Sequence, residues 1–564
     1  MKIPSEDKNK GYDRLMFYHE VIQACFYSRK KRQSQYETLK HYYLYGAGPE
    51  SEPTAYNKVE PIIDTLSAFL YSADSTRFST HMSPETPEME WDKAQPIAKA
   101  VNSEWMNSGC DQTFSRALDW ALVYNCTIIK TIPKGGHLEP YIVDPECFGV
   151  YREDVTGIDR QEALAHRYYI TKSQLRQELE AHPNRDAILR TIEPKPKTTQ
   201  DEMPDGLRKI MVTNLAGIPP ITPGNTVTGN GTLNLSEKMD YVPGVSAEVV
   251  EMTELWIRDD ELNDWRTVTM AEGPVVIYDR ENIFVPHEQP FSQVCPMPMH
   301  GYFWGYSFAD KLTGLQAWRN LRLDEIQHIL AKQAHPPTAM SGFTGIVDET
   351  AFALDTPGGV LNNTDPMGGK TEQFAPEVTP DLWHDLSMID EMFMEAAGLS
   401  PLLMGRGETG VRSGRQTSEL SRLGSSRTKK RALAIEDDLE TLATKMFKAL
   451  RKYNDDAMLT VPLKPETKPE KFILNQAPDD AVIKVDAHSN SPLFVEDQKE
   501  LAGTLLEAHA IDRESFIEML NPPMKDVLVR NLSKIMKAES DAAKMKMQQE
   551  QQAIQAKHQQ KGPQ

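Results

Sequence analysis

Two glycine-rich stretches contain the residue types that cradle phosphate groups. Residues 405–410, GRGETG, match the G-x-G-x-x-G pattern of dinucleotide loops, but a helical segment precedes them where that site needs a strand. Residues 368–371, GGKT, end like a phosphate-binding loop. The glycine required five residues before the second of these glycines is replaced by Thr364, and Pro366 removes an amide donor. We therefore interpret the two stretches as a loop and a surface turn.

Other catalytic patterns are also incomplete. Residues 305–309, GYSFA, half-match a nucleophile elbow, but they open a helix with no hydrophobic strand before it. Ser307 is therefore predicted to be a helix cap. The 14 histidines include no H-E-x-x-H pattern, and the 5 cysteines form no C-x-x-C pair. The sequence gives no positive support for an enzyme, a cofactor or a metal site.

The overall composition limits the class of protein further. The chain has 564 residues, 62 of them basic and 82 acidic, and a net charge of −20; its mean hydropathy is −0.52. It has no apolar leader and no run of 18 apolar residues, so we expect neither secretion nor a membrane span. The scattered cysteines are expected to be reduced and mostly buried. Coating of nucleic acid by bulk charge is not expected of an acidic chain, although local contact with DNA stays open.

Helical and strand patterns alternate along the first half of the chain. Residues 1–125 favour helices, and apolar side chains recur at helical spacing through residues 59–70. Short β-branched or aromatic segments follow over residues 126–286, including a hairpin whose loop is residues 259–264. Residues 194–245 are rich in Pro, Gly, Thr and Asn and predict a long irregular excursion. The pattern predicts an α+β fold with a mainly antiparallel sheet.

The second half begins with a helix of about 25 residues that stops at His335. A short β-and-turn stretch follows over residues 338–378, and a second helix then starts at Thr379 and runs to Gly398. After a Gly- and Arg-rich loop, apolar spacing predicts another long helix through residues 435–453. Two more strands and a helical C-terminal part complete the chain.

The helix from Thr379 to Gly398 carries charges of one sign. On a helical wheel with ~100° per residue, Asp385, Glu391 and Glu395 lie within about 80° of Asp381. The apolar residues occupy the neighbouring sector, and the segment contains no Lys or Arg: Leu382, Leu386, Ile389, Phe393, Ala396 and Ala397. An ordinary surface helix usually mixes signs, so this face invites a specific explanation.

The sign of the charge reverses directly after this helix. Residues 405–431 contain two acids and eight basic residues: Arg406, Arg412, Arg415, Arg422, Arg427, Lys429, Lys430 and Arg431. Arginines on a glycine-rich loop can reach phosphates. Pairing with acids such as those of residues 436–440 is equally compatible with the sequence, because no aromatic residues interleave to stack on bases.

The order helix, β-stretch, acidic helix, Gly/Arg loop and long helix resembles a tailed-phage portal protein, the head-to-tail connector of double-stranded DNA phages. The resemblance is clearest from Phe303 to Asp437. It implies a portal-type fold with a wing of helices and antiparallel strands, a two-helix stem, a small β clip and a helical crown. It divides the chain into wing (1–305), first stem helix (306–335), clip (336–378), second stem helix (379–399), tunnel loop (400–416), long kinked helix with the rest of the wing (417–490), and crown with the C-terminal tail (491–564).

The resemblance also implies a function. Portal proteins form a ring, usually of twelve copies, at one capsid vertex; genomic DNA is packaged and ejected through it. Its expected partners are double-stranded DNA, the terminase large subunit, head-tail adaptor or tail proteins, and the major capsid and scaffolding proteins, in a virion assembled from chains made in the host cytoplasm. By this reading Asp381, Asp385, Glu391 and Glu395 line the channel, and Arg406, Arg412 and Arg415 contact DNA. The alternatives are another oligomeric phage capsid or tail protein without a channel role, and a nucleic-acid-processing enzyme that binds phosphate through residues 405–431.

Overall fold

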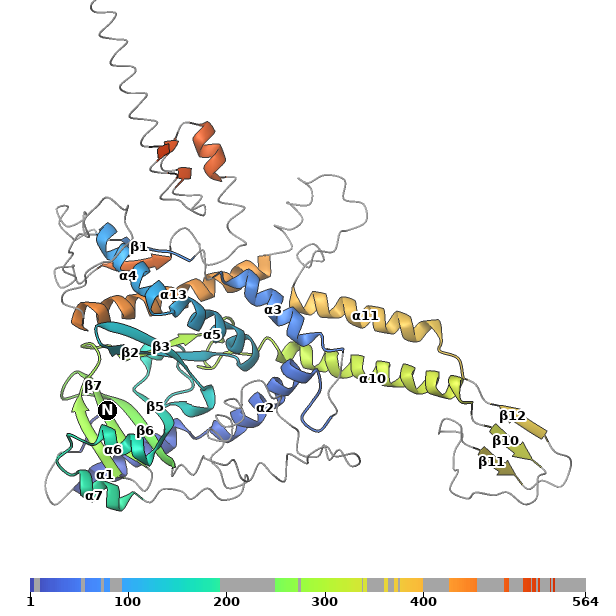
Figure 1. Cartoon of the computed structure of the whole chain (residues 1–564), viewed down its shortest axis with the longest axis horizontal. Coiled ribbons are helices and arrows are strands. Elements are labelled where there is room, and N and C mark those ends of the chain that lie inside the picture. Colours follow the sequence, from blue (N-terminus) through green and yellow to red (C-terminus); the bar gives the residue numbers. More distant parts are fainter. Residues whose placement is uncertain are drawn as a thin grey trace, which may run out of the picture.

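The computed structural model describes residues 1–4, 11–51, 56–72, 76–81, 94–192, 249–271, 275–336, 338–341, 360–363, 370–373, 376–398, 426–453, 481–485 and parts of 501–532. A body of helices and mainly antiparallel sheets carries two long helices that extend away from it (Figure 1). The fold is α+β, as the sequence predicts. The predicted excursion at residues 194–245 and the Gly/Arg loop lie outside the described residues.

Four helices of the first half pack around the main hydrophobic core. They are α2 (Arg29–Tyr45), α3 (Val59–Leu70), α4 (Ala94–Asn107) and α5 (Cys110–Tyr124). The periodicity predicted for α3 is confirmed, because Val59, Ile62, Ile63, Leu66 and Leu70 are all buried. All five cysteines are buried free thiols, as predicted.

Asp111 lies in the first turn of α5 but does not cap the helix. The helix begins one residue earlier, at Cys110, and its N-cap is Gly109 with φ 69°, which makes no side-chain cap. The Asp111 carboxylate instead accepts hydrogen bonds from the indole of Trp105 and the hydroxyl of Tyr71. A buried aromatic donor without a partner costs more than an unmade cap at an exposed helix end, which explains the choice.

Two larger antiparallel sheets lie in the body, beside the short pair of β1 (Phe78–His81) and β13 (Val482–Val485). The larger has the order β4-β5-β6-β7-β8: β4 (Phe148–Val150), β5 (Ala163–Thr171), β6 (Val249–Asp259), β7 (Asp264–Ala271) and β8 (Val275–Glu281). Asp259 pairs with Asp264, so the predicted hairpin loop is confirmed. The smaller has the order β3-β2-β9: β2 (Thr127–Lys134), β3 (His137–Val143) and β9 (Phe291–Val294). The sequence did not predict β9, or β1, which pairs with β13.

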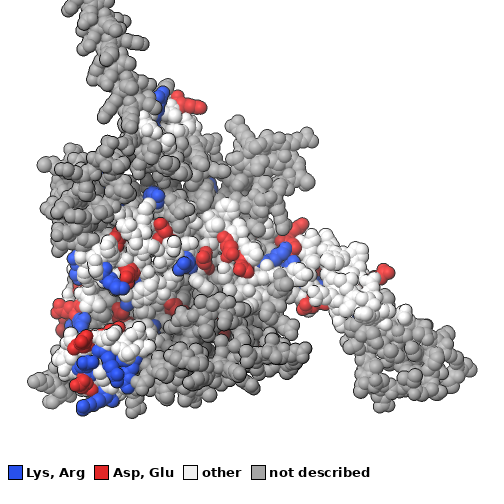
Figure 2. All heavy atoms as spheres, in the orientation of Figure 1, with Lys and Arg blue, Asp and Glu red and all other residues white. Residues whose placement is uncertain are grey.

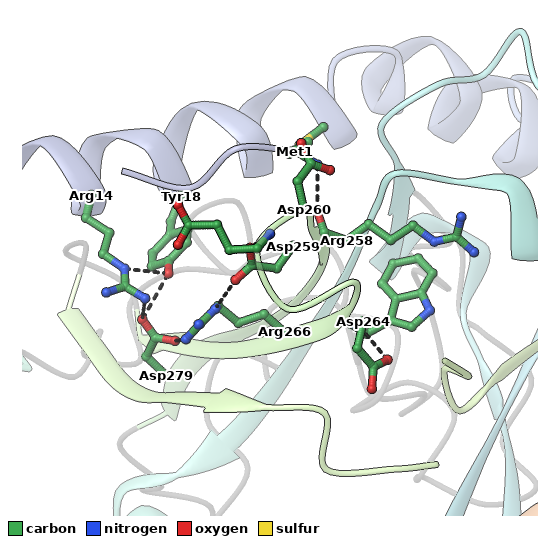
Figure 3. A network of polar contacts seen from close by, with 11 residues as sticks. Met1, Arg14, Tyr18, Arg258, Asp259, Asp260, Asp264, Arg266 and Asp279 are labelled. Carbon is green, nitrogen blue, oxygen red and sulfur yellow. Dashed lines mark hydrogen bonds and ion pairs between the residues drawn. The ribbon is translucent and has the colours of Figure 1, made fainter. Parts of the chain in front are cut away.

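A polar network fastens helix α1 (Gly11–Cys25) to one end of the large sheet (Figure 3). Tyr18 donates to Asp279 at 2.9 Å and accepts from Arg14 at 2.8 Å. Arg266 bridges Asp279 and Asp259, with both N–O distances at 2.9 Å. Burial raises the pKa of Tyr18, so its hydroxyl keeps its proton and remains a donor. Residues from α1, β6, β7 and β8 are thus held by one set of contacts.

A buried ion pair joins the two sheets. Lys130 of β2 pairs with Glu254 of β6, which also accepts from the Trp256 indole at 2.6 Å. The imidazole of His166 lies near this ion pair, with its ring centre 5.5 Å from that of Tyr168. Burial, and then the Lys130 charge, lower the pKa of His166 to about 3. The folded protein therefore holds this imidazole neutral through the physiological range.

His166 makes the stability of the fold depend on pH. Below pH ~6.5 the unfolded chain binds a proton that the folded protein excludes until about pH 3, so stability falls by about 1.4 kcal/mol per pH unit in that window. Phenylalanine suits the aromatic neighbours of His166. Between pH ~6.5 and pH ~5, we expect the free energy of unfolding of His166→Phe to fall by about 2 kcal/mol less than that of the wild type. Urea unfolding at both pH values measures this. Equal losses in the two proteins would show that another group controls the pH dependence.

The two extending helices are α10 (Asp310–Ala334) and α11 (Pro380–Ala397). The N-cap of α10 is Ala309 and makes no side-chain cap, so the capping role predicted for Ser307 is wrong in position. Ser307 lies two residues earlier and accepts from the amide of Asp310 at 3.1 Å. Between the two helices lies a small sheet of order β11-β10-β12: β10 (Thr338–Ser341), β11 (Val360–Asn363) and β12 (Lys370–Gln373). Figure 1 shows α10 and α11 side by side, with this sheet at their far end.

Helix α13 (Ser426–Tyr453) crosses the body beside β9, β2 and β3. Asp438 accepts from the amide of Cys295 at 2.7 Å, and buried Lys445 donates to Asp159 and to the carbonyl of Phe291, both at 2.6 Å. Further along, Lys448 pairs with Glu288, and Lys452 donates to the carbonyl of Phe284 at 2.5 Å. The helix is therefore fastened to residues 283–295 along its second half: Asp438, Lys445, Lys448, Lys452 and Tyr453 make these contacts.

Candidate functional site

The apolar face of α11 packs as its sequence pattern predicts. Ile389, Phe393 and Ala397 are fully buried, and Leu382 and Leu386 are half-buried. Helix α10 runs alongside and buries one stripe of its own: Leu312, Gln316, Arg319 and Ile326. The charged face of α11 must therefore point away from this packed surface, because the two sectors lie on different sides of the helix.

One of the four predicted acids turns toward α10. Asp385 forms an ion pair of 2.5 Å with Arg322, which also pairs with Glu325 at 2.6 Å. Its side chain is 21% exposed. At about 40° from Asp381 on the wheel, it stands on the edge nearest the apolar sector, which brings it within reach of the neighbouring helix.

A second ion-pair group fixes the base of the helix pair. Asp390 is the acid that lies off the acidic face, and it binds Arg319 at 3.0 Å and Lys58 at 2.6 Å. Arg319 also donates to the carbonyl of Tyr56 at 3.0 Å. Burial alone would raise the pKa of Asp390, but the hydrogen bonds from Lys58 and Arg319 outweigh it and lower that pKa. The contacts tie α10, α11 and the start of α3 together.

The other three predicted acids remain free. Asp381, Glu391 and Glu395 are exposed, and none has an ion-pair partner among the described residues. Elsewhere Figure 2 shows acidic and basic side chains intermixed over the described face of the body. On α11 the exposed charge is of one sign, and Met388 is exposed on the same side, at about −20° on the wheel. The helix thus presents a face of three carboxylates that have no ion-pair partner in the described part of the chain.

Because Asp385 is ion-paired to Arg322, we expect substitutions at Asp385 and Glu391 to change the stability of the protein by different amounts. Asp385→Asn removes the charge that faces Arg322, so we expect a loss of about 0.5–1 kcal/mol in the free energy of unfolding. Glu391→Gln removes an unpaired exposed charge and should change that free energy by less than about 0.5 kcal/mol. Denaturant titration of the two proteins compares them directly. Equal effects would mean that the Arg322 contact does not stabilise the helix pair.

The predicted basic site cannot be placed. Arg406, Arg412 and Arg415 lie outside the described residues. The sequence also allows the basic segment to pair with acids of residues 436–440. One of these acids, Glu440, accepts from Lys484 at 2.5 Å and from the amide of Val485. The contacts of Arg427 and Arg431 are with carbonyl groups at the end of α11.

Within the described ranges, no group of three or more His, Cys, Asp or Glu side chains could hold a metal ion. No helix in the same ranges combines the length and apolar composition of a membrane crossing. The geometry is thus a projecting pair of helices with an acidic face, and the comparison with known proteins decides its family.

Residues 81–462, well over half of the chain, match the sequence model of the phage SU10 portal protein family. The chain belongs to the phage SU10 portal protein family. This places it among the structural proteins of the phage particle, and it gives the portal role to the region that contains both projecting helices, the small sheet and α13.

A solved structure is also similar to this portal protein. It is a chain from the virion of a native gene transfer agent particle, with 9% sequence identity and a TM-score of 0.36. The match covers 82% of the portal chain and 90% of the other chain. No curated protein matches the sequence.

Proposed function

We propose that copies of this portal protein form a ring around an axis at one capsid vertex, and that genomic DNA passes along the axis during packaging and ejection. The observation that carries the proposal is the face of α11. Asp381, Glu391 and Glu395 are exposed and have no ion-pair partner among the described residues, while the neighbouring sector of the helix is packed and Asp385 at its edge is ion-paired to α10. A helix pair built in this way is rigid and presents negative charge in one direction.

A negative wall suits a passage for duplex DNA. The duplex carries one charge per ~1.7 Å, and each phosphate neutralised by a protein adds affinity and slows movement. Carboxylates repel the phosphates and so keep the duplex away from the wall. Arg406, Arg412 and Arg415 would supply the few attractive contacts that resist backward slippage.

The remaining parts have proposed roles as well. Helices α10 and α11 are the stem, the sheet β10–β12 is the clip, and the body from α1 to β9 with α13 is the wing. Residues 400–416 are the tunnel loop, and the part after residue 490 is the crown. The clip is the proposed docking site of the terminase large subunit and later of adaptor or tail proteins; the wing and crown face the major capsid and scaffolding proteins.

Negative-stain electron microscopy of the purified full chain tests this function. We expect rings with a central hole, usually of twelve copies. A monomer, or an assembly in which α11 faces outward, would support the alternative of a phage structural protein without a channel. Met388 is exposed on the acidic side of α11. A label attached at this position shows whether the acidic face points toward the central hole or outward.

A further inference from the structure

The C-terminal end of α11 has no compensating charge of its own. The helix ends at Gly398, which has φ 69° and donates its amide to the carbonyls of Met394 and Glu395. No basic residue lies in the last turn. The end of a helix carries partial negative charge, and cations stabilise it. A chain with eight basic residues soon after this helix could supply such cations.

Two of those arginines do so from the start of α13. Arg427 donates to the carbonyl of Glu395 at 3.3 Å, and Arg431 donates to the carbonyl of Ala397 at 3.3 Å. The partners are 32 and 34 positions apart in sequence. Gly398 also leaves room for this arrangement, because a Cβ at that position would lie 3.2 Å from Cδ of Arg427.

Arg431 adds a third element to the junction. Its guanidinium lies 5.0 Å from the centre of the Phe308 ring, in the segment that leads into α10. Burial lowers the pKa of Arg431, and the nearby charge of Arg427 lowers it further. The group nevertheless stays protonated at neutral pH, because arginine starts far above that range. The lead-in to α10, the end of α11 and the start of α13 meet at one half-buried cation.

We propose that Arg427 and Arg431 form a clamp that holds these three elements as one unit. The chain leaves α11 and re-enters α13 at the clamp, so the clamp sets the two points between which residues 399–425 are attached. Resting on the proposed channel function, the two arginines are positioning residues: they hold α11 and the start of α13 in place beside the proposed DNA path without contacting DNA themselves.

Spin labels on α11 and α13 test the clamp directly. All five native cysteines are buried, so cysteines introduced at the exposed positions Met388 and Leu433 react selectively. Pulsed electron–electron double resonance is measured on labelled full chains diluted with unlabelled protein. It should give one narrow distance distribution when Arg427 and Arg431 are both present. Arg427→Gln with Arg431→Gln should broaden it at least two-fold. Lys430→Gln, an equal loss of charge at an exposed position of the same helix, should leave it narrow.

Two further variants protect the test against misfolding. Gly398→Ala keeps both arginines, but its φ of 69° strains an alanine and its Cβ would lie 3.2 Å from Cδ of Arg427, so the junction shifts and the distribution should broaden. Arg431→Lys keeps the charge and one donor and should restore part of the narrow distribution. An unchanged distribution in the Gln and Ala variants overturns the clamp.

The positioning role has its own measurement. In assembled rings, the time that a duplex dwells in the passage should change at least three-fold in the clamp variants relative to Lys430→Gln. A broad distance distribution with an unchanged dwell time overturns the positioning role. If the wild type forms no ring, the channel function fails, while the distance measurement still decides whether the clamp exists.

Discussion

Replacing Asp381, Glu391 and Glu395 together by lysine should lengthen the dwell time of duplex DNA in the proposed passage by roughly ten-fold or more at low salt. Each copy loses three exposed carboxylates and gains three ammonium groups, so a repelling wall becomes one that binds phosphates. If three phosphates are neutralised at a time, raising the salt from ~50 to ~200 mM should weaken binding by roughly 40-fold, and the excess dwell time should shrink with it. Ionic current through single rings seated in a solid-state pore measures the dwell time.

The control for this triple variant carries the same change of charge elsewhere. Glu180, Asp186 and Glu281 are exposed acids at α6 (Lys172–Glu178), α7 (Arg185–Thr191) and the end of β8. Lysine at those three positions should leave the dwell time at the wild-type value. If both variants slow DNA equally, the effect comes from total charge rather than from the face of α11. If neither slows it, α11 does not line the passage.

The largest loss of stability is expected from Lys130→Ala. Its removal leaves Glu254 buried without its cation, and breaking a buried ion pair on one side typically costs about 3–5 kcal/mol. Glu254 would keep only the indole donor of Trp256. Urea unfolding followed by circular dichroism measures the free energy, and the transition should move to markedly lower denaturant.

Two further proteins separate the ion pair from the loss of side-chain volume. Lys130→Met combined with Glu254→Gln removes both charges but keeps an acceptor for Trp256, so it should recover most of the lost stability. Lys134 lies on the same strand but forms an exposed pair with Glu139, so Lys134→Met should cost less than about 1 kcal/mol. A double variant as unstable as Lys130→Ala would assign the loss to packing.

Much of the fold could be predicted from local patterns. The spacing of Ile62, Leu66 and Leu70 identifies α3, because the helical period follows from backbone geometry. The β-branched and aromatic residues on both sides of the turn at residues 259–264 identify the β6–β7 hairpin. The buried side of α11 was predicted for the same reason, and Ile389, Phe393 and Ala397 confirm it.

The rest depends on contacts between distant parts of the chain. In the sequence, Asp385 cannot be told apart from the other three acids of the same helix face. Only the position of Arg322 on α10 distinguishes it. The pairing of Lys130 with Glu254 joins two sheets, and nothing local indicates it beyond a single charged residue within residues 127–133 of the strand. Strand β9 is too short for its period to be detected, and it exists because β2 offers an edge for it.

The contacts of α13 have a mechanical consequence. The helix is about 42 Å long at 1.5 Å per residue, and hydrogen-bonded helices resist compression along their axis. One end touches the last turn of α11, and the other is anchored to residues 283–295. A push along α11 would therefore reach residues 283–295, which include β9, as a displacement of this rod.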